Sequence, residues 1–161
     1  MKAALSFALV AVAAIFFTIG RTTARNSALH QQTLDNLSTA MHGEAFAFAK
    51  YHLYAQHARQ SGNRPLAQLF SSTARVERLQ HFAEEAQLAG FVGSDADNLK
   101  DAIKGESYEV NTMYADFAKQ AAAVGDKAAA DRFEEIRHDE MGHLEAYQKA
   151  LKALESQQSG N

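Results

Sequence analysis

The sequence predicts an all-α fold, a four-helix bundle built from two repeated helical hairpins. The first observation is composition: the 161 residues contain a single proline and long proline-free runs of Ala, Leu, Glu, Gln and Lys, which favour helix. The second is an internal repeat. The third is a spacing of three to four residues between apolar positions in each predicted helix, as in amphipathic helices. Together they favour two tandem hairpins.

The repeat sets the order of the helices. DNLSTAMHGE (35–44) and DNLKDAIKGE (97–106) are identical at six of ten positions. Further on, YAQHARQSG (54–62) matches FAKQAAAVG (117–125), and AQLF (67–70) matches ADRF (130–133). A glycine turn therefore joins two helices in each half, and Pro65 suits the first turn of a helix. We expect helices over 32–61, 64–89, 95–124 and 127–156, with the halves joined at 90–94.

The N-terminus differs from the rest of the chain. Residues 3–20 carry no charge and are flanked by Lys2, Arg21 and Arg25. This pattern fits either a cleaved signal peptide or a retained membrane anchor. We therefore expect a signal or anchor over 1–24, a linker over 25–32, a helical domain over 33–156 and a frayed tail over 157–161. The domain would be exported, periplasmic or anchored to the inner membrane, with the cytoplasmic side left open.

Composition also excludes several functions. The chain has no cysteine, which excludes disulfides, thiolate catalysis and Cys-ligated zinc or iron–sulfur centres within it. The net charge is −3 and there is no basic stripe, so we expect no nucleic-acid partner.

Each predicted helix has an apolar stripe that is interrupted near its middle by acidic residues. The stripes consist of Leu37, Met41, Phe48, Tyr51 and Ala55; of Leu66, Phe70, Thr73 and Leu88; of Leu99, Ala102, Met113 and Phe117; and of Phe133, Ile136, Tyr147, Leu151 and Leu154. The interrupting acids are Glu44, Glu77, Glu106, Glu109 and Glu140, accompanied by His81 and His143. These acids should meet at one depth in the bundle.

Five carboxylates at one depth require compensation. An ionised carboxylate removed from water without a partner costs several kcal/mol or more. No lysine or arginine lies on the inner stripes, whereas two divalent cations would leave about one net negative charge. Carboxylate and imidazole ligands suit iron or manganese.

The spacings agree with metal ligation. Glu106 with Glu109, and Glu140 with His143, stand three apart and so share a helix face. Either pair alone is more often a solvated surface pair. Glutamates on some helices combined with Glu-x-x-His on others form the di-iron bundle pattern.

These motifs resemble the rubrerythrin family of ferritin-like proteins. The resemblance rests on NLSTAMHGE (36–44), ARVERLQH (74–81), GESYE (105–109) and DEMGH (139–143), and covers about 33–152. It implies a site for two iron ions, with manganese not excluded. The implied ligands are Glu44, Glu77, His81, Glu106, Glu109, Glu140 and His143. The resemblance also implies that Tyr51 and Tyr114 hydrogen-bond to ligand carboxylates, although packing in an aromatic core is an equal alternative.

The sequence departs from the family pattern in two ways. Glu77 and His81 stand four apart rather than three, so the second helix has gained a residue, and we expect a π-bulge there. The cysteines of a rubredoxin domain are absent, so we expect electrons to come from an external rubredoxin-like or other carrier protein.

The resemblance implies reduction of hydrogen peroxide to water by a di-iron oxidoreductase, with Glu44, Glu77, Glu106, Glu109, Glu140 and His143 as its catalytic groups. Three alternatives remain: an enzyme that oxidises ferrous iron with dioxygen, a non-catalytic di-metal protein, and a purely structural bundle. In the first alternative, Glu84 and Glu85 would form a surface path for iron ions. We expect a homodimer. We also expect two metal ions per chain, or two per site if the chains of the dimer exchange helices. An uncleaved N-terminal helix would add the membrane as a partner.

Overall fold

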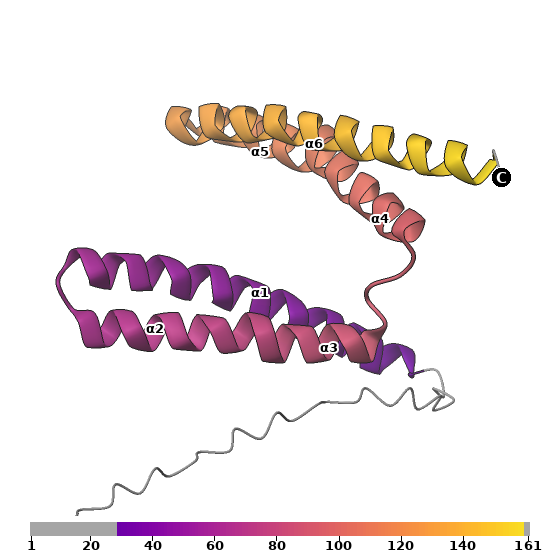
Figure 1. Ribbon diagram of the computed structural model, residues 1–161. Helices are drawn as coiled ribbons and strands as arrows, with labels where there is room; N and C mark the ends of the chain where they lie inside the picture. The colour runs from indigo at the N-terminus through magenta and orange to yellow at the C-terminus, as the bar shows by residue number, and fades with distance from the viewer. Residues whose placement is uncertain (1–28, 160–161) are drawn as a thin grey trace, which may run out of the picture.

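A computed structural model of the protein describes residues 29–159, all of whose regular structure is helical (Figure 1). The first rod is α1 (Gln31–Gln60). The second runs through α2 (Arg64–Val76), η1 (Glu77–His81) and α3 (Phe82–Ala89). The third runs through α4 (Asp95–Tyr108), η2 (Glu109–Met113) and α5 (Tyr114–Val124), and the fourth is α6 (Lys127–Ser159). The four predicted helices are confirmed, and α6 continues beyond its predicted end at 156.

Glycines with left-handed backbone angles end three of the rods. Gly62, Gly90 and Gly125 have φ values of 77°, 62° and 89°. After Gly90 the amide of Phe91 donates to the carbonyl of Ala86 at 2.9 Å, which is the Schellman pattern, and equivalent hydrogen bonds follow the other two glycines. The predicted turns therefore lie where the sequence placed them.

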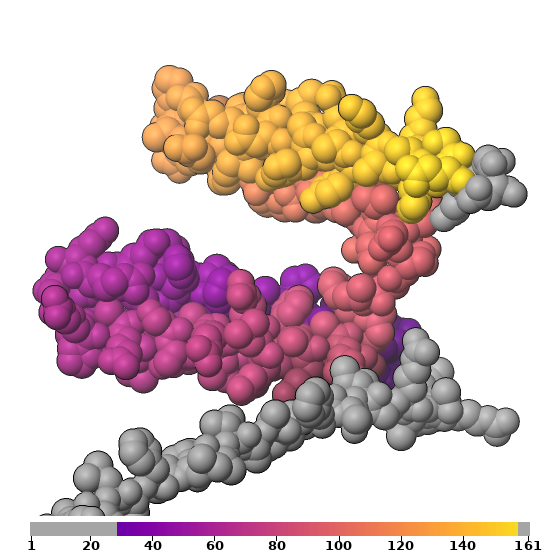
Figure 2. Space-filling model, in the orientation of Figure 1, coloured from indigo at the N-terminus to yellow at the C-terminus, as the bar shows by residue number. Residues whose placement is uncertain are grey.

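The rods form two hairpins that lie apart. In hairpin 1, α1 packs along α2, η1 and α3; in hairpin 2, α6 packs along α4, η2 and α5. Within residues 29–159, no helix of hairpin 1 packs against a helix of hairpin 2. The space-filling view shows the hairpins separated along most of their length and approaching each other at the linker (Figure 2). The four helices therefore do not enclose a common interior within one chain.

The core of each hairpin is thin. The buried hydrophobic residues are seven alanines together with Met41 and Val110, and within the described residues no large side chain is fully buried. Each hairpin also has an aromatic triad near its turn: Tyr51, Tyr54 and Phe70 in one, Tyr114, Phe117 and Phe133 in the other. The matching triads show that the sequence repeat is also a structural repeat.

Two π-helical turns interrupt the second and third rods. In η1 the amide of Phe82 donates to the carbonyl of Glu77, five residues back, which confirms the predicted π-bulge. The turn at η2 was not predicted. There the amide of Tyr114 donates to the carbonyl of Glu109 instead of that of Val110. The Val110 carbonyl accepts a hydrogen bond from Nε of Arg137 at 2.8 Å, which ties η2 to α6.

The predicted hydrophobic segment at 3–20, and with it the expected signal peptide or anchor, lies outside the described residues. Among residues 29–159, the structure contains no helix with the length and apolar character needed to span a membrane.

We predict that Arg137→Met lowers the free energy of unfolding by about 1.5–3 kcal/mol, because it leaves the part-buried Val110 carbonyl without its charged donor. The matched control is Arg132→Met, whose ion pair with Glu135 is exposed and should contribute about 0.5 kcal/mol or less. Chemical denaturation followed by circular dichroism measures both. Equal losses in the two variants would contradict the assigned role of Arg137.

Candidate metal centre

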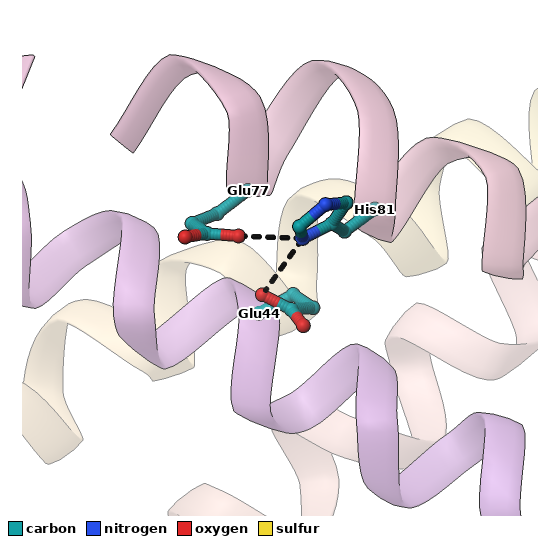
Figure 3. Close-up of side chains that lie close together, drawn as sticks. All are labelled: Glu44, Glu77 and His81. Carbon is teal, nitrogen blue, oxygen red and sulfur yellow. Dashed lines mark ion pairs between the residues drawn. The ribbon is translucent and has the colours of Figure 1, made fainter. Parts of the chain in front are cut away.

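Hairpin 1 brings together one glutamate from α1 and the two ends of η1 (Figure 3). Nδ1 of His81 lies 2.7 Å from Oε2 of Glu77 and 3.8 Å from Oε2 of Glu44. The three side chains offer ligand atoms that all lie within 4.8 Å of one another. We call these three residues cluster 1.

Hairpin 2 repeats this arrangement with nearly equal distances. Nδ1 of His143 lies 2.6 Å from Oε2 of Glu140 and 4.0 Å from Oε2 of Glu106. These three residues also fall within 4.8 Å of one another, and we call them cluster 2. The structure thus has two carboxylate–histidine clusters, one in each hairpin.

The π turn explains why the two clusters match despite their different spacing. In a straight α-helix His81 would lie about 40° to one side of Glu77, whereas a residue three positions on lies about 60° to the other side. The wider turn of η1 absorbs the additional residue. His81 therefore reaches Glu77 at 2.7 Å, as His143 reaches Glu140 at 2.6 Å across a regular α-helical spacing.

Burial and neighbouring acids disturb the ionisation of both clusters. Desolvation, followed by the adjacent carboxyl of Glu77, raises the pKa of Glu44. Desolvation, followed by the carboxyl of Glu140, raises the pKa of Glu106. The hydrogen bond to Glu140 raises the pKa of His143. The metal-free clusters therefore favour bound protons, which is the charge that a cation would replace.

Unpartnered oxygens show that protein hydrogen bonds do not satisfy these acids. Oε2 of Glu106 is buried and has no hydrogen-bond partner, and the same is true of Oε2 of Glu85. Carboxylate oxygens and imidazole nitrogens are ligands of iron and manganese. The residues present therefore fit the metal ions implied by the sequence.

Glu85 is a carboxylate that the predicted ligand set leaves out. It lies on α3, four residues after His81, and its charge contributes to the raised pKa of Glu44. The sequence suggested Glu84 and Glu85 only as a surface path for iron. The spacing of four residues from His81, on one helix face, was the available signal for its position.

The remaining predicted residues lie nearby but outside the two clusters. Glu109 begins η2, and its charge helps raise the pKa of Tyr114, after the effect of burial. Within the described residues, neither Tyr51 nor Tyr114 donates a hydrogen bond to a cluster carboxylate. Tyr51 stacks on Phe70 at 6.0 Å, and Tyr114 packs against its own aromatic neighbours, so both pack as aromatic residues here.

The position of η2 could have been found in the repeat. The offset between the halves is 62 residues up to Glu44 and Glu106, but 63 residues at Gly62 and Gly125. One residue has therefore been added between Glu106 and Gly125, and η2 absorbs it. Each hairpin contains one such addition, in η1 and in η2.

The fold and the clusters define a class, that of helical carboxylate–histidine metal proteins whose two matching clusters are consistent with a pair of iron ions. Comparison with known proteins gives the family. The rubrerythrin family model matches residues 35–81 and 76–151. The chain belongs to the rubrerythrin family.

Two relatives known by sequence support this assignment. The chain is 34% identical over 146 residues to a protein of Methanocaldococcus jannaschii named for the same family, covering 78% of this chain and 72% of that protein. It is 31% identical to nigerythrin of Nitratidesulfovibrio vulgaris over 137 residues, covering 77% and 68%. Among solved structures, fully reduced, all-ferrous nigerythrin is 31% identical, with 83% of this chain and 72% of that chain covered and a TM-score of 0.40.

The stability of the metal-free protein should fall as pH rises. The pKa values of Glu44, Glu106 and His143 are raised in the folded protein. Each group's contribution to the free energy of unfolding is therefore fully present below its ordinary pKa, about 4.3 for Glu and 6.5 for His, and is lost as the pH rises through the folded-state pKa. We therefore expect the free energy of unfolding of the metal-free protein to decrease between about pH 5 and about pH 8. Denaturation in chelator at several pH values measures this.

The double variant Glu44→Gln/Glu106→Gln is the control for this pH dependence. It removes two of the three groups, so the decrease should become shallower. A pH dependence as steep as that of the natural sequence would contradict the assignment.

Deletion of Gln80 should convert η1 into regular α-helix. The deletion leaves Glu77 and the histidine three residues apart, as in cluster 2, so metal binding should persist and thermal stability should be unchanged or higher. Deletion of Met141 is the matched control, because it removes a residue from regular helix between Glu140 and His143. That control should lose metal. Loss of metal after deletion of Gln80 would show that the π turn itself is required.

Proposed function

We propose that this protein is a di-iron peroxidase that reduces hydrogen peroxide to water with electrons from an external donor protein. The observation that carries the proposal is the pair of matching clusters, each with two carboxylates and one histidine, in a chain of the rubrerythrin family. Two ferrous ions held by these residues would supply the two electrons that convert hydrogen peroxide and two protons into two water molecules.

The charged and the neutral side chains at the clusters would have different roles in binding the metal ions. The four glutamates of the clusters, together with Glu109 beside cluster 2, would hold the cations and offset their charge, and His81 and His143 would complete the coordination as neutral ligands. The pairing of each histidine with a carboxylate at 2.6–2.7 Å already fixes the imidazole orientation in the metal-free protein. Such pre-set side chains lower the cost of assembling the centre.

The exposure of the two histidines and the tyrosine near cluster 2 bear on how the oxidant reaches the clusters and on which group can donate a hydrogen bond there. The side chains of His81 and His143 are 50% and 58% exposed, so a small oxidant can reach both clusters from solvent. Burial and the charges of Glu109, Glu140 and Glu106 raise the pKa of Tyr114. This tyrosine therefore keeps its proton at neutral pH and can donate it as a hydrogen bond beside cluster 2.

The electron donor would be a separate protein. Without cysteine, this chain has no thiolate-ligated iron centre of its own to relay electrons. A rubredoxin-like or other small carrier is the class of partner that fits.

A second candidate function is ferrous iron oxidation by dioxygen. The unpartnered Oε2 of Glu85 beside Glu44 favours it, because an additional carboxylate next to a metal cluster can hold an ion in transit. The choice of oxidant separates the two functions.

The test loads the purified protein with ferrous iron without oxygen and mixes it with peroxide or with dioxygen in a stopped-flow spectrophotometer. The peroxidase proposal expects oxidation by peroxide to be several-fold faster at equal oxidant concentration. Similar rates, or a faster reaction with dioxygen, would favour iron oxidation instead.

Two variants on one helix complete the design. Glu140→Gln removes a carboxylate of cluster 2, so fast oxidation by peroxide should disappear. Glu135 lies on the same helix but pairs with Arg132 on the exposed surface. The variant Glu135→Gln should therefore be oxidised by peroxide at the rate of the natural sequence. A fast reaction in Glu140→Gln would place the chemistry elsewhere.

A further inference from the structure

One side of hairpin 1 gathers basic and polar side chains from both of its rods. Nη1 of Arg59 in α1 donates to Oγ of Ser71 in α2 at 3.2 Å. Ser71 in turn lines a hollow in the surface, whose other lining residues are Gln68, Ser72, Arg75, Val76, Leu79 and Gln80. Arg59 and Arg75 are exposed, although they are far apart in the sequence and come from different helices. We call the surface formed by Arg59, Arg75, Arg78 and this hollow the basic face.

Arg78 connects the basic face to the neighbourhood of cluster 1. Its guanidinium lies over the ring of Phe48, 5.3 Å from the centroid, and Phe48 packs on His52 with the ring centroids 6.3 Å apart. Phe48 follows Glu44 by about one helical turn, and Arg78 directly follows Glu77. The basic face therefore reaches the level of the cluster along both rods.

The hollow and cluster 1 lie on different sides of the second rod. Arg75 precedes Glu77 by two residues, which separates the two side chains by roughly 160° around an α-helix. None of the three cluster residues lines the hollow. A protein bound to the basic face therefore leaves the cluster side free. It is separated from the cluster by a single helix, about 10–12 Å across with its side chains.

The sequence repeat shows that this face belongs to hairpin 1 alone. The offset of 63 residues that relates Phe70 to Phe133 also relates four positions of the hollow to positions in α6. Gln68, Ser71, Ser72 and Val76 correspond in this way to Asp131, Glu134, Glu135 and Asp139. Hairpin 2 is thus acidic where hairpin 1 is neutral or basic. Three of these acids already pair with cations of their own helix, which are Lys127, Arg132 and Arg137.

The cations of the basic face have no acidic partner within the described chain. Residues 45–76 contain no aspartate or glutamate. Among residues 29–159, the ion pairs involve none of Arg59, Arg75 and Arg78. Exposed charges of one sign attract a partner of the opposite charge and steer its approach. Leu79, which is 53% exposed, adds apolar surface within the same hollow.

We propose that the basic face of hairpin 1 is the docking site of the electron donor, and that this donor is a small protein with an acidic surface. The proposal rests on the peroxidase function above, which takes electrons from outside the chain, and it adds where the donor binds and which charge it presents. Each encounter oxidises the carrier by one electron and reduces one ferric ion, so two encounters restore the ferrous pair. The electrons enter on the side of cluster 1.

Electron-transfer kinetics test the docking. The iron-loaded, oxidised protein is mixed in a stopped-flow spectrophotometer with a reduced rubredoxin of net negative charge, whose oxidation is followed by its colour. We expect the second-order rate constant to fall as the ionic strength rises, because salt screens the attraction between the two surfaces. A rate constant that is independent of ionic strength would overturn the proposal.

Two double variants with the same change in charge locate the site. At low ionic strength, Arg59→Gln/Arg75→Gln should lower the rate constant about tenfold. Lys127→Gln/Arg132→Gln removes two cations from α6 and should lower it less than about twofold. Equal losses in the two variants would mean that only net charge matters, and would overturn the proposal. Reduction by dithionite at high ionic strength should be the same in all three proteins, which shows that the centre is intact.

The single variant Arg75→Gln guards against a folding defect in the double variant. Arg75 forms no ion pair among the described residues, so its replacement should leave the circular dichroism spectrum unchanged. We expect it to lower the rate constant about threefold at low ionic strength. An unchanged rate constant in this folded variant would contradict the assignment of the hollow.

Binding to the metal-free protein separates this proposal from the peroxidase function. Calorimetry at low ionic strength should show that oxidised rubredoxin binds the natural sequence and Lys127→Gln/Arg132→Gln, and binds Arg59→Gln/Arg75→Gln several-fold more weakly. This result would support the docking face even if peroxide proved not to be the substrate. Equal binding by all three proteins would overturn the docking face, even if peroxide oxidised the ferrous protein rapidly. Salt-sensitive self-association through the basic face, without rubredoxin binding, would assign it to a second copy and also overturn the proposal.

Discussion

The need to compensate carboxylates on apolar helix faces governs this protein. Glu44 and Glu106 have raised pKa values because burial and a neighbouring carboxyl oppose their charge. Oε2 of Glu106 is buried without a hydrogen bond, so the protein alone does not satisfy it. If these positions contributed only to stability, apolar residues such as leucine would be expected there, because they need no compensating charge. Bound cations would compensate the acids that each hairpin brings together in its cluster.

The repeat supplies this arrangement twice, and the π turns adjust it. Cluster 1 and cluster 2 agree in their histidine–glutamate distances because η1 absorbs the additional residue before His81. Hairpin 2 has its own added residue in η2, where Arg137 satisfies the carbonyl that the turn releases. In η1, the residue that the π turn absorbs thus preserves the geometry of the histidine–glutamate pair at the cost of local irregularity.

Much of this could be predicted from sequence because helix stripes and repeats are local patterns. The helices, apart from the last turn of α6, and the glycine turns follow from apolar spacing and from the repeat. The π turn at Glu77–His81 follows from the residue added relative to the family pattern. The turn at η2 is also indicated by the sequence, because the offset between the two halves changes from 62 to 63 residues between Glu106 and Gly125. No unusual spacing of predicted ligands indicates it. The separation of the hairpins could not be predicted, since apolar stripes show that a face is covered without showing which chain covers it. The burial of Oε2 of Glu85 likewise depends on packing between helices.

We infer that cations replace protons on the two clusters. Calorimetric titration of the metal-free protein with a divalent metal ion, in two buffers of different ionisation enthalpy, measures ion number and proton release together. We predict two ions per chain and net proton release, because the raised pKa values of Glu44, Glu106 and His143 favour protons that the metal then displaces. Saturation at one ion per chain or fewer, or binding without proton release, would contradict it.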